Sequence, residues 1–263
     1  MLFRSTLVEA CRGCHDTAVA FAAPFVSGKD SLNNVFSHTD AAGNHHELSI
    51  PPTLLATAMG QVDDVRKAMT PDLKSPGSRL AIVGLTRDEL AGSQLEICGH
   101  VTDGRIPHVD TSACRATFAA VAAAIRSGCV AACHDISDGG IAAAVAEMAI
   151  AGGCGARLDL AAVPAEITEA DAAHRDLAIA FAETPGRFVC EVPVAAAERF
   201  ASVVGDVPWA WAGTVTAEPS LDLAATDGRS LRVPVAALSD AWRSLGKSPP
   251  SPSSHDACSH PAP

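Results

Sequence analysis

From residue 79 onward, short apolar runs alternate with segments whose apolar positions recur every three to four residues. The runs have the length of buried β-strands, and the repeating segments have the period of helices with one apolar face. The strands are expected at residues 79–85, 129–135, 157–160, 186–192, 209–215, 221–226 and 230–233. The helices are expected at residues 111–127, 140–151, 165–182, 194–204 and 234–245. This alternation predicts a mixed α/β (α+β) fold built in layers.

Polar residues and glycines mark the ends of two of these helices. Asp110 or Thr111 is expected to cap the helix at 111–127, and Gly128 to stop it. Gly152 and Gly153 are expected to close the helix at 140–151.

The chain before residue 79 has a different pattern. Residues 5–22 predict a helix, because small and apolar side chains recur there at steps of four and three. A short apolar strand is expected from Pro24, an exposed loop at 37–49 and an apolar strand at 53–62. The charged, proline-bearing segment 62–79 is interpreted as a connection between two domains.

Cys11, Cys14 and His15 spell the attachment signature of c-type haem. Both cysteines lie on the apolar stripe of the predicted helix, together with Leu7 and Phe21. We therefore interpret the motif as two small thiols on a buried helix face, and we expect no haem.

Composition narrows the class of protein. The 263 residues are 48% hydrophobic and 19% charged, which is enough to bury a sizeable core, and the formal net charge is −11. The basic residues are not clustered, so a nucleic-acid surface is not expected.

No apolar run approaches the ~18 residues of a membrane span, so no membrane is expected. The nine cysteines and the absence of a secretory signal predict a reducing, cytoplasmic location.

The stretch CHDISDGG, residues 133–140, joins an apolar strand to a helix. Ligands of layered α/β folds bind where a strand ends and a helix begins, and the free N–H groups of a helix start attract phosphate. The carboxylates of Asp135 and Asp138 would repel a phosphate group unless a Mg²⁺ ion lay between the carboxylates and the phosphate oxygens. Alternatively, Asp138 is only a helix cap and Asp135 turns the chain. Both interpretations remain open at this point.

A second stretch, VSGKDSLNN at residues 26–34, also follows a short apolar run. Gly28 gives access to the backbone, Lys29 supplies a cation, and Ser31 with two asparagines supplies hydrogen-bond donors. The P-loop pattern is absent. By itself this stretch is a weak signal for anion binding.

Taken with their neighbours, the two stretches resemble the synthetase subunit of phosphoribosylformylglycinamidine synthase. That family belongs to the aminoimidazole ribonucleotide synthetase superfamily. The similar segments include PFVSGKDSLNN, MGQVDD, TPDLK, HDISDGGIAAAVAEMAIAGGCGARLDL and FAETPGRFVCEVPV, and they span residues 5 to about 245.

The resemblance implies an aminoimidazole ribonucleotide synthetase-like C-terminal domain with a layered mixed sheet and helices. The tail of an N-terminal-type domain would precede it. Residues 1–64 would be the remnant of the second N-terminal-type domain, and residues 65–245 the second C-terminal-type domain. Residues 246–263, which are rich in proline and serine, are expected to be disordered.

The resemblance further implies an ATP-dependent ligase of purine biosynthesis. It converts formylglycinamide ribonucleotide to the amidine with glutamine-derived ammonia, and it uses ATP and Mg²⁺. Carried over by position, Gly28 and Lys29 would contact ATP, Ser31 the substrate, Asp135 the metal and Ser137 a nucleotide. The family's catalytic histidine lies in the first half of its synthetase, so this chain would hold no catalytic residue of its own.

The expected partners are a glutaminase subunit that supplies ammonia and the missing first half of the synthetase or a companion chain. We expect the isolated chain to be inactive, and we expect either a truncated or split gene or a companion chain that completes the sheet of the first domain. The alternative is a non-catalytic nucleotide-binding or assembly module of the same superfamily. Glu183 and Arg187, in ETPGR, are expected to form a buried ion pair, and the three tryptophans to pack in or around the core.

Overall fold

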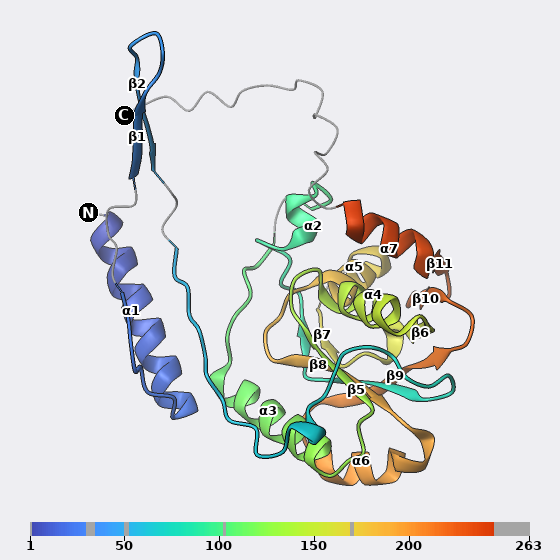
Figure 1. The fold of residues 1–263 in the computed structure, drawn as a ribbon. Helices are drawn as coiled ribbons and strands as arrows, with labels where there is room; N and C mark the ends of the chain where they lie inside the picture. The colour runs from blue at the N-terminus through green and yellow to red at the C-terminus, as the bar shows by residue number, and fades with distance from the viewer. Residues whose placement is uncertain (1, 30–34, 50–52, 102–103, 169–170, 245–263) are drawn as a thin grey trace. The chain divides into compact units, whose positions relative to one another are not determined.

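The computed structural model describes residues 2–29, 35–49, 53–101, 104–168 and 171–244 (Figure 1). The chain divides into two compact units, residues 1–68 and 69–263. Ser31 and the tail 246–263, on which two of the sequence predictions fall, lie outside the described residues.

The second unit is built on a seven-stranded mixed sheet in the order β11-β10-β6-β9-β3-β8-β5. β6 and β10 are parallel, and the other neighbouring pairs are antiparallel. The strands are β3 (Arg79–Val83), β5 (Ala132–Ile136), β6 (Gly155–Asp159), β8 (Arg187–Val192), β9 (Trp209–Thr216), β10 (Ser220–Ala224) and β11 (Ser230–Pro234). All seven strands predicted for this region are therefore present, with shifts of up to three residues at their ends.

Helices cover both faces of the sheet and give the predicted layers (Figure 1). They are α3 (Thr111–Arg126), α4 (Gly140–Gly152), α5 (Ala172–Phe181), α6 (Ala197–Val204) and α7 (Val235–Ser244). α4, α5 and α7 lie on one side, and α3 and α6 on the other.

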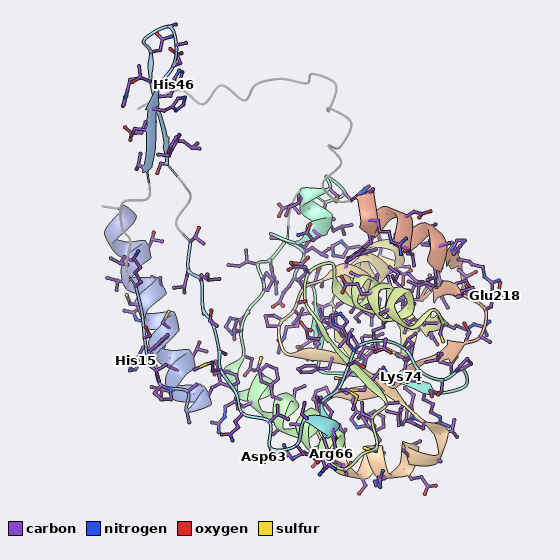
Figure 2. All side chains as sticks on the ribbon, viewed as in Figure 1. His15, His46, Asp63, Arg66, Lys74 and Glu218 are labelled. Atoms are coloured by element: carbon purple, nitrogen blue, oxygen red, sulfur yellow. The ribbon has the colours of Figure 1, made fainter. Side chains whose placement is uncertain are left out.

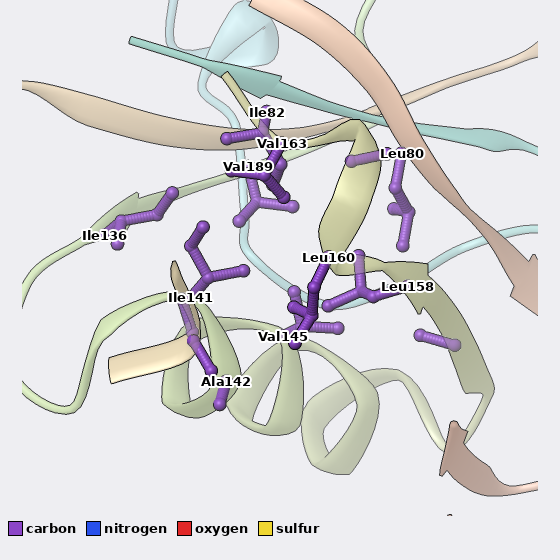
Figure 3. Packing of buried hydrophobic residues seen from close by; sticks show 14 of the residues in the cluster. Leu80, Ile82, Ile136, Ile141, Ala142, Val145, Leu158, Leu160, Val163 and Val189 are labelled. Atoms are coloured by element: carbon purple, nitrogen blue, oxygen red, sulfur yellow. The ribbon is translucent and has the colours of Figure 1, made fainter. Parts of the chain in front are cut away.

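Successive side chains of the interior strand β3 point to the two faces of the sheet in turn. Leu80 and Ile82 point to the α4 side, where they join Ile141 and Val145 in one core (Figure 3). Ala81 and Val83 join the second core, with side chains from α3 and α6. All four β3 residues are fully buried. This alternation is the two-residue period of a strand that is covered on both sides.

The predicted helix ends are confirmed. The Asp110 side chain accepts a hydrogen bond from the Ala113 N–H at 2.9 Å, which makes Asp110 the cap of α3. Gly153 ends α4 in the left-handed conformation, with φ of 65°. Both features follow from local chemistry alone, which is why sequence could identify them.

One predicted helix begins later than expected. Residues 165–166 form a short strand, β7 (Ala165–Glu166), which pairs with β4 (Thr86–Arg87). α5 begins only at Ala172, because the Asp171 side chain accepts from the His174 N–H at 2.8 Å and caps the helix there. Neither β4 nor the short helix α2 (Gln94–Ile97) was predicted. Short 3-10 helices lie at Val65–Lys67, Leu160–Ala162 and Val194–Ala196.

The first unit begins with α1 (Leu2–Phe21), which confirms the predicted helix. The interpretation that its two thiols are buried is wrong for this chain. Cys11 is exposed, Cys14 is half-buried, and Leu7 on the same stripe is 38% exposed. The described part of this unit is too small to cover the stripe. His15 hydrogen-bonds the Asp16 carboxylate beside it at 3.0 Å (Figure 2).

The predicted loop at 37–49 is a β-hairpin instead. β1 (Val35–Thr39) and β2 (His45–Ser49) pair antiparallel, and Asp40 organises the turn between them. Its carboxylate accepts from the backbone N–H groups of Ala42 and Asn44 and contacts His46 on β2 at 2.9 Å (Figure 2). These hydrogen bonds, that to His46 foremost, lower the pKa of Asp40 to about 2. Both strands of the hairpin are exposed, so the segment is polar. This polarity led to the prediction of a loop instead of a hairpin.

The strands predicted from Pro24 and at 53–62 are not formed. The described residues of both segments are irregular, and their apolar side chains are exposed, with Leu55 at 88% and Met59 at 90%. A strand requires a neighbouring strand for its backbone groups, and none of the described strands pairs with these segments.

The prediction for the tryptophans holds for two of the three. Trp209 and Trp211 pack against the buried ring of Phe200, with ring centroids 5.5 and 5.4 Å away. Trp242, on α7, is 57% exposed.

Candidate functional site

The candidate site is the loop that joins β5 to α4. Ile136 is buried, while its neighbours Asp135 and Ser137 are exposed on the strand end and the loop. Gly139 and Gly140 follow with φ of 75° and 68°, and α4 begins at Gly140. The structure thus presents the predicted metal and nucleotide residues, Asp135 and Ser137, to solvent on one short segment.

The two glycines are required by this turn. Positive φ is unfavourable for residues with a Cβ. In addition, a Cβ on Gly140 would lie 2.7 Å from the Ala180 carbonyl oxygen, on the backbone of α5. The turn can therefore pack this tightly only with glycine at residue 140.

A carboxylate from another loop holds the start of α4. Glu183 Oε1 accepts from the Gly139 N–H and from the Gln94 N–H, each at 2.8 Å. The interpretation of Asp138 as the helix cap is wrong, because the cap residue is Gly139 and the Asp138 side chain is exposed. Sequence could not find this contact, because Glu183 lies 44 residues further along the chain.

His134 links Asp135 to α4. Its Nδ1 atom lies 2.7 Å from the Asp135 carbonyl oxygen and 3.2 Å from Asp135 Oδ1. Its Nε2 atom lies 3.0 Å from Glu147 Oε2, on α4. The only sequence signal for His134 is its place in the CHDISDGG stretch, and Glu147 was not predicted.

Arg187 is buried behind this loop, with 1% of its surface exposed. The ion pair predicted between Arg187 and Glu183 is not formed. Arg187 donates instead to the carbonyl oxygens of Thr184 and Ala182 and to the Thr86 hydroxyl, while Glu183 faces backbone N–H groups. Burial lowers the pKa of Arg187 to about 10, against the opposing effect of the Glu89 and Glu183 charges.

Two of the other three predicted site residues belong to the first unit, and the third lies outside the described residues. Gly28 and Lys29 are exposed, in an irregular segment of the first unit. Ser31 lies outside the described residues. Of the five predicted residues, Asp135 and Ser137 lie together in the second unit, at the end of β5 and on the loop after it.

The exposed Asp135 side chain is a carboxylate, the kind of group that ligates Mg²⁺ beside a nucleotide. Among the described residues, no three His, Cys, Asp or Glu side chains are grouped so that they could hold a metal ion by themselves. Mg²⁺ in nucleotide sites needs no such cage, because one or two carboxylates bind it together with phosphate oxygens and water. An exposed carboxylate beside Ser137 fits that requirement. The Gly139 N–H, in contrast, already donates to Glu183.

None of the described helices is both long enough and apolar enough to cross a membrane.

Comparison with known proteins identifies the family. Residues 75–225 match the family model described as AIR synthase related protein, C-terminal domain. The match covers more than half of the chain, so the chain belongs to this family. The fold class predicted from the sequence, a layered mixed sheet with helices, is confirmed.

Curated relatives are phosphoribosylformylglycinamidine synthase subunits PurL. The chain is 35% identical over 188 residues to PurL of Thermococcus gammatolerans, which covers 72% of this chain and 24% of the relative. It is 31% identical over 243 residues to PurL of Anaeromyxobacter sp., which covers 89% of this chain and 29% of the relative. The predicted resemblance is confirmed, and the chain spans less than a third of the length of either relative.

Solved structures show the same fold. Thermotoga maritima PurL complexed with ATP superposes with a TM-score of 0.55 at 19% identity, over 66% of this chain and 27% of that chain. T. maritima PurL complexed with FGAR gives a TM-score of 0.56 at 18% identity, over 75% of this chain and 32% of that chain.

Proposed function

We propose that this chain contributes part of an ATP-dependent phosphoribosylformylglycinamidine synthase. The reaction converts formylglycinamide ribonucleotide to formylglycinamidine ribonucleotide with glutamine-derived ammonia. The observation that carries the proposal is the 35% identity with a PurL subunit over 72% of this chain, together with the match of residues 75–225 to the family domain. The domain organisation predicted from sequence, with a C-terminal-type domain at 65–245 after a remnant at 1–64, is part of the proposal.

Within this activity, the β5–α4 loop would bind a magnesium nucleotide. Asp135 would ligate Mg²⁺, which neutralises phosphate charge when it is bound, and the Ser137 hydroxyl would contact the nucleotide. Their exposure at the end of β5 and on the loop that follows it supports this assignment. His134 would orient the Asp135 carboxylate through its contact at 3.2 Å.

The remaining assignments concern the first unit and the partners. Gly28 and Lys29 would contact ATP, and Ser31 the substrate. A glutaminase subunit would supply ammonia, and the remainder of the synthetase would come from another part of the polypeptide or a companion chain. The structure named PurLQS from T. maritima, with a TM-score of 0.55 to this chain, shares the fold.

Calorimetric titration of the full chain with ATP and with ADP, each with and without Mg²⁺, tests the nucleotide site. We expect Mg²⁺-dependent binding that is lost in Asp135→Ala and weakened in Ser137→Ala. Asp206→Ala serves as the charge-matched control, because Asp206 is exposed in the turn after α6 and should leave binding unchanged. Equal binding by Asp135→Ala and the wild type would contradict the assignment.

A second experiment separates the ligase from the alternative of a non-catalytic binding or assembly module. Formylglycinamide ribonucleotide, ATP, Mg²⁺ and ammonia are supplied to the chain alone and to the chain with a PurL relative truncated before the matched region. We expect no amidine from the chain alone and product formation from the mixture. Nucleotide binding without product in the mixture would favour the module.

A further inference from the structure

Two cysteines face each other across neighbouring strands of the sheet. Cys133 on β5 is the direct partner of Cys190 on β8 in the antiparallel pairing. Their Sγ atoms are 3.8 Å apart. Cys133 is half-buried and Cys190 is completely buried, so the pair lies at the margin of the second core.

The backbone geometry at this position suits a covalent link. The Cys133 N–H donates to the Thr70 carbonyl oxygen at 3.3 Å, and therefore it does not point toward β8. The pair is thus of the non-hydrogen-bonded kind, in which opposite Cα atoms are about 4.5 Å apart and the side chains are closest. Disulfides span Cα separations of about 4.4–6.8 Å, so only side-chain rotation is needed to join these sulfurs.

We propose that Cys133 and Cys190 are an oxidative modification site, at which a hydroperoxide converts the two thiols to a cross-strand disulfide. The inference is independent of the proposed ligase activity, because it rests on the thiol pair alone.

The reaction proceeds in two balanced steps. The Cys133 thiolate attacks the peroxide, so that an S–O bond forms, the O–O bond breaks and hydroxide or an alkoxide leaves; the sulfur is oxidised and the peroxide reduced. The Cys190 thiol then attacks the Cys133 sulfur and loses its proton. The S–S bond forms, the S–O bond breaks, and the departing hydroxide takes up that proton and leaves as water.

The environments of the two thiols set this order. Cys133 is the more accessible of the two sulfurs. The hydrogen bond to Cys133 and burial raise the pKa of Cys190, which disfavours its direct reaction with peroxide. Cys129, another thiol of the second core, is directed elsewhere: its Sγ contacts the Ser127 hydroxyl at 3.0 Å and the Ala124 carbonyl oxygen at 3.2 Å.

The proposed disulfide would lie next to the candidate site. β5 is the last strand of the sheet, so β8 is its one neighbour in the strand order. Cys133 lies two residues before Asp135, and Cys190 lies three residues after Arg187. A disulfide would therefore link this edge strand, which carries Asp135, to β8 just before the loop that carries Ser137.

The test is peptide mapping of the full chain by mass spectrometry after exposure to hydrogen peroxide and alkylation of the remaining thiols. We expect one linked species, Cys133–Cys190, that is lost on reduction with dithiothreitol. It should form at least ~10-fold faster than any link between exposed Cys98 side chains of two chains, because the reaction is intramolecular.

The variants Cys190→Ala and Cys133→Ala complete the test. In Cys190→Ala we expect no link at Cys133, which should instead accumulate as the sulfenic acid and be trapped by dimedone. In Cys133→Ala we expect Cys190 to remain unoxidised. The proposal is overturned if both thiols of the wild type stay free while Cys98 is oxidised, or if Cys133 is linked to any other cysteine.

Discussion

Glu183 Oε1 lies 2.8 Å from the backbone nitrogen of Gly139, at the start of α4. The same oxygen lies 2.8 Å from the nitrogen of Gln94, at the start of α2. A negative charge at a helix N-terminus is favourable because it meets unpaired N–H groups and the positive end of the helix dipole. The Glu183 carboxylate therefore accepts the hydrogen bond of the Gly139 N–H, one of the helix-start N–H groups that the sequence had suggested as a phosphate site.

Replacing Glu183 tests whether this contact stabilises the fold. Glu183→Ala leaves two backbone donors without their acceptor, and we expect a loss of about 2 kcal/mol in the free energy of unfolding. Glu183→Gln keeps one amide oxygen for both N–H groups, so we expect a loss of about 1 kcal/mol. Urea denaturation measures both values. Equal losses in the two variants would show that the charge, and not the acceptor atom, is what matters.

Gly140 and Gly153 form a matched pair at the two ends of α4. Both have positive φ, but a Cβ on Gly140 would strike the backbone of α5, whereas a Cβ on Gly153 would meet open space. We expect Gly153→Ala to cost about 1–2 kcal/mol from backbone strain. Gly140→Ala should cost at least about 2 kcal/mol more, because the helices must separate. Similar melting temperatures for the two variants would contradict the packing described here.

Asp110 should stabilise α3 as an N-cap. Asp110→Ala is expected to lower the free energy of unfolding by about 1 kcal/mol, measured by urea denaturation at neutral pH. Asp110→Asn retains a side-chain oxygen for the Ala113 N–H and should lose much less. A loss in Asp110→Asn as large as that in Asp110→Ala would indicate a role for the charge other than capping.

The Asp222–Arg232 pair predicts a dependence of stability on pH. Asp222 Oδ1 and Oδ2 accept from the Arg232 guanidinium at 2.7 and 2.8 Å, and this contact lowers the pKa of Asp222. A carboxyl group with a lowered pKa in the folded state stabilises the protein above the ordinary value of about 3.9. The stabilisation is lost as the pH falls through the folded-state pKa.

The measurement compares the wild type with Asp222→Asn by urea denaturation across the acid range. We expect the variant to be less stable by about 1 kcal/mol at neutral pH, because the pair joins β10 to β11 at the sheet surface. The difference should vanish once Asp222 is protonated in the folded state. A difference that persists at the lowest pH would assign the effect to packing.

Much of the second unit was predictable because its sequence signals are local and its sheet is covered on both faces. The apolar run at β3, the apolar stripe of α3 and the glycines at the end of α4 each depend on a few neighbouring residues. The first unit was predicted less well. The apolar segment at 53–62 lacks a strand partner in the described chain, and the polar segment at 35–49 forms a hairpin through the turn chemistry of Asp40.

The sequence by itself determined the fold class, the family resemblance and the position of Asp135 and Ser137 between a strand and a helix. Those features depend on residues that are adjacent or a few positions apart. Only the tertiary structure decided that Glu183 holds the start of α4, that Arg187 binds backbone carbonyls instead of Glu183, and that Cys133 faces Cys190. These contacts join residues on different strands and loops, and their partners are chosen by strand order, register and burial, which no local pattern specifies.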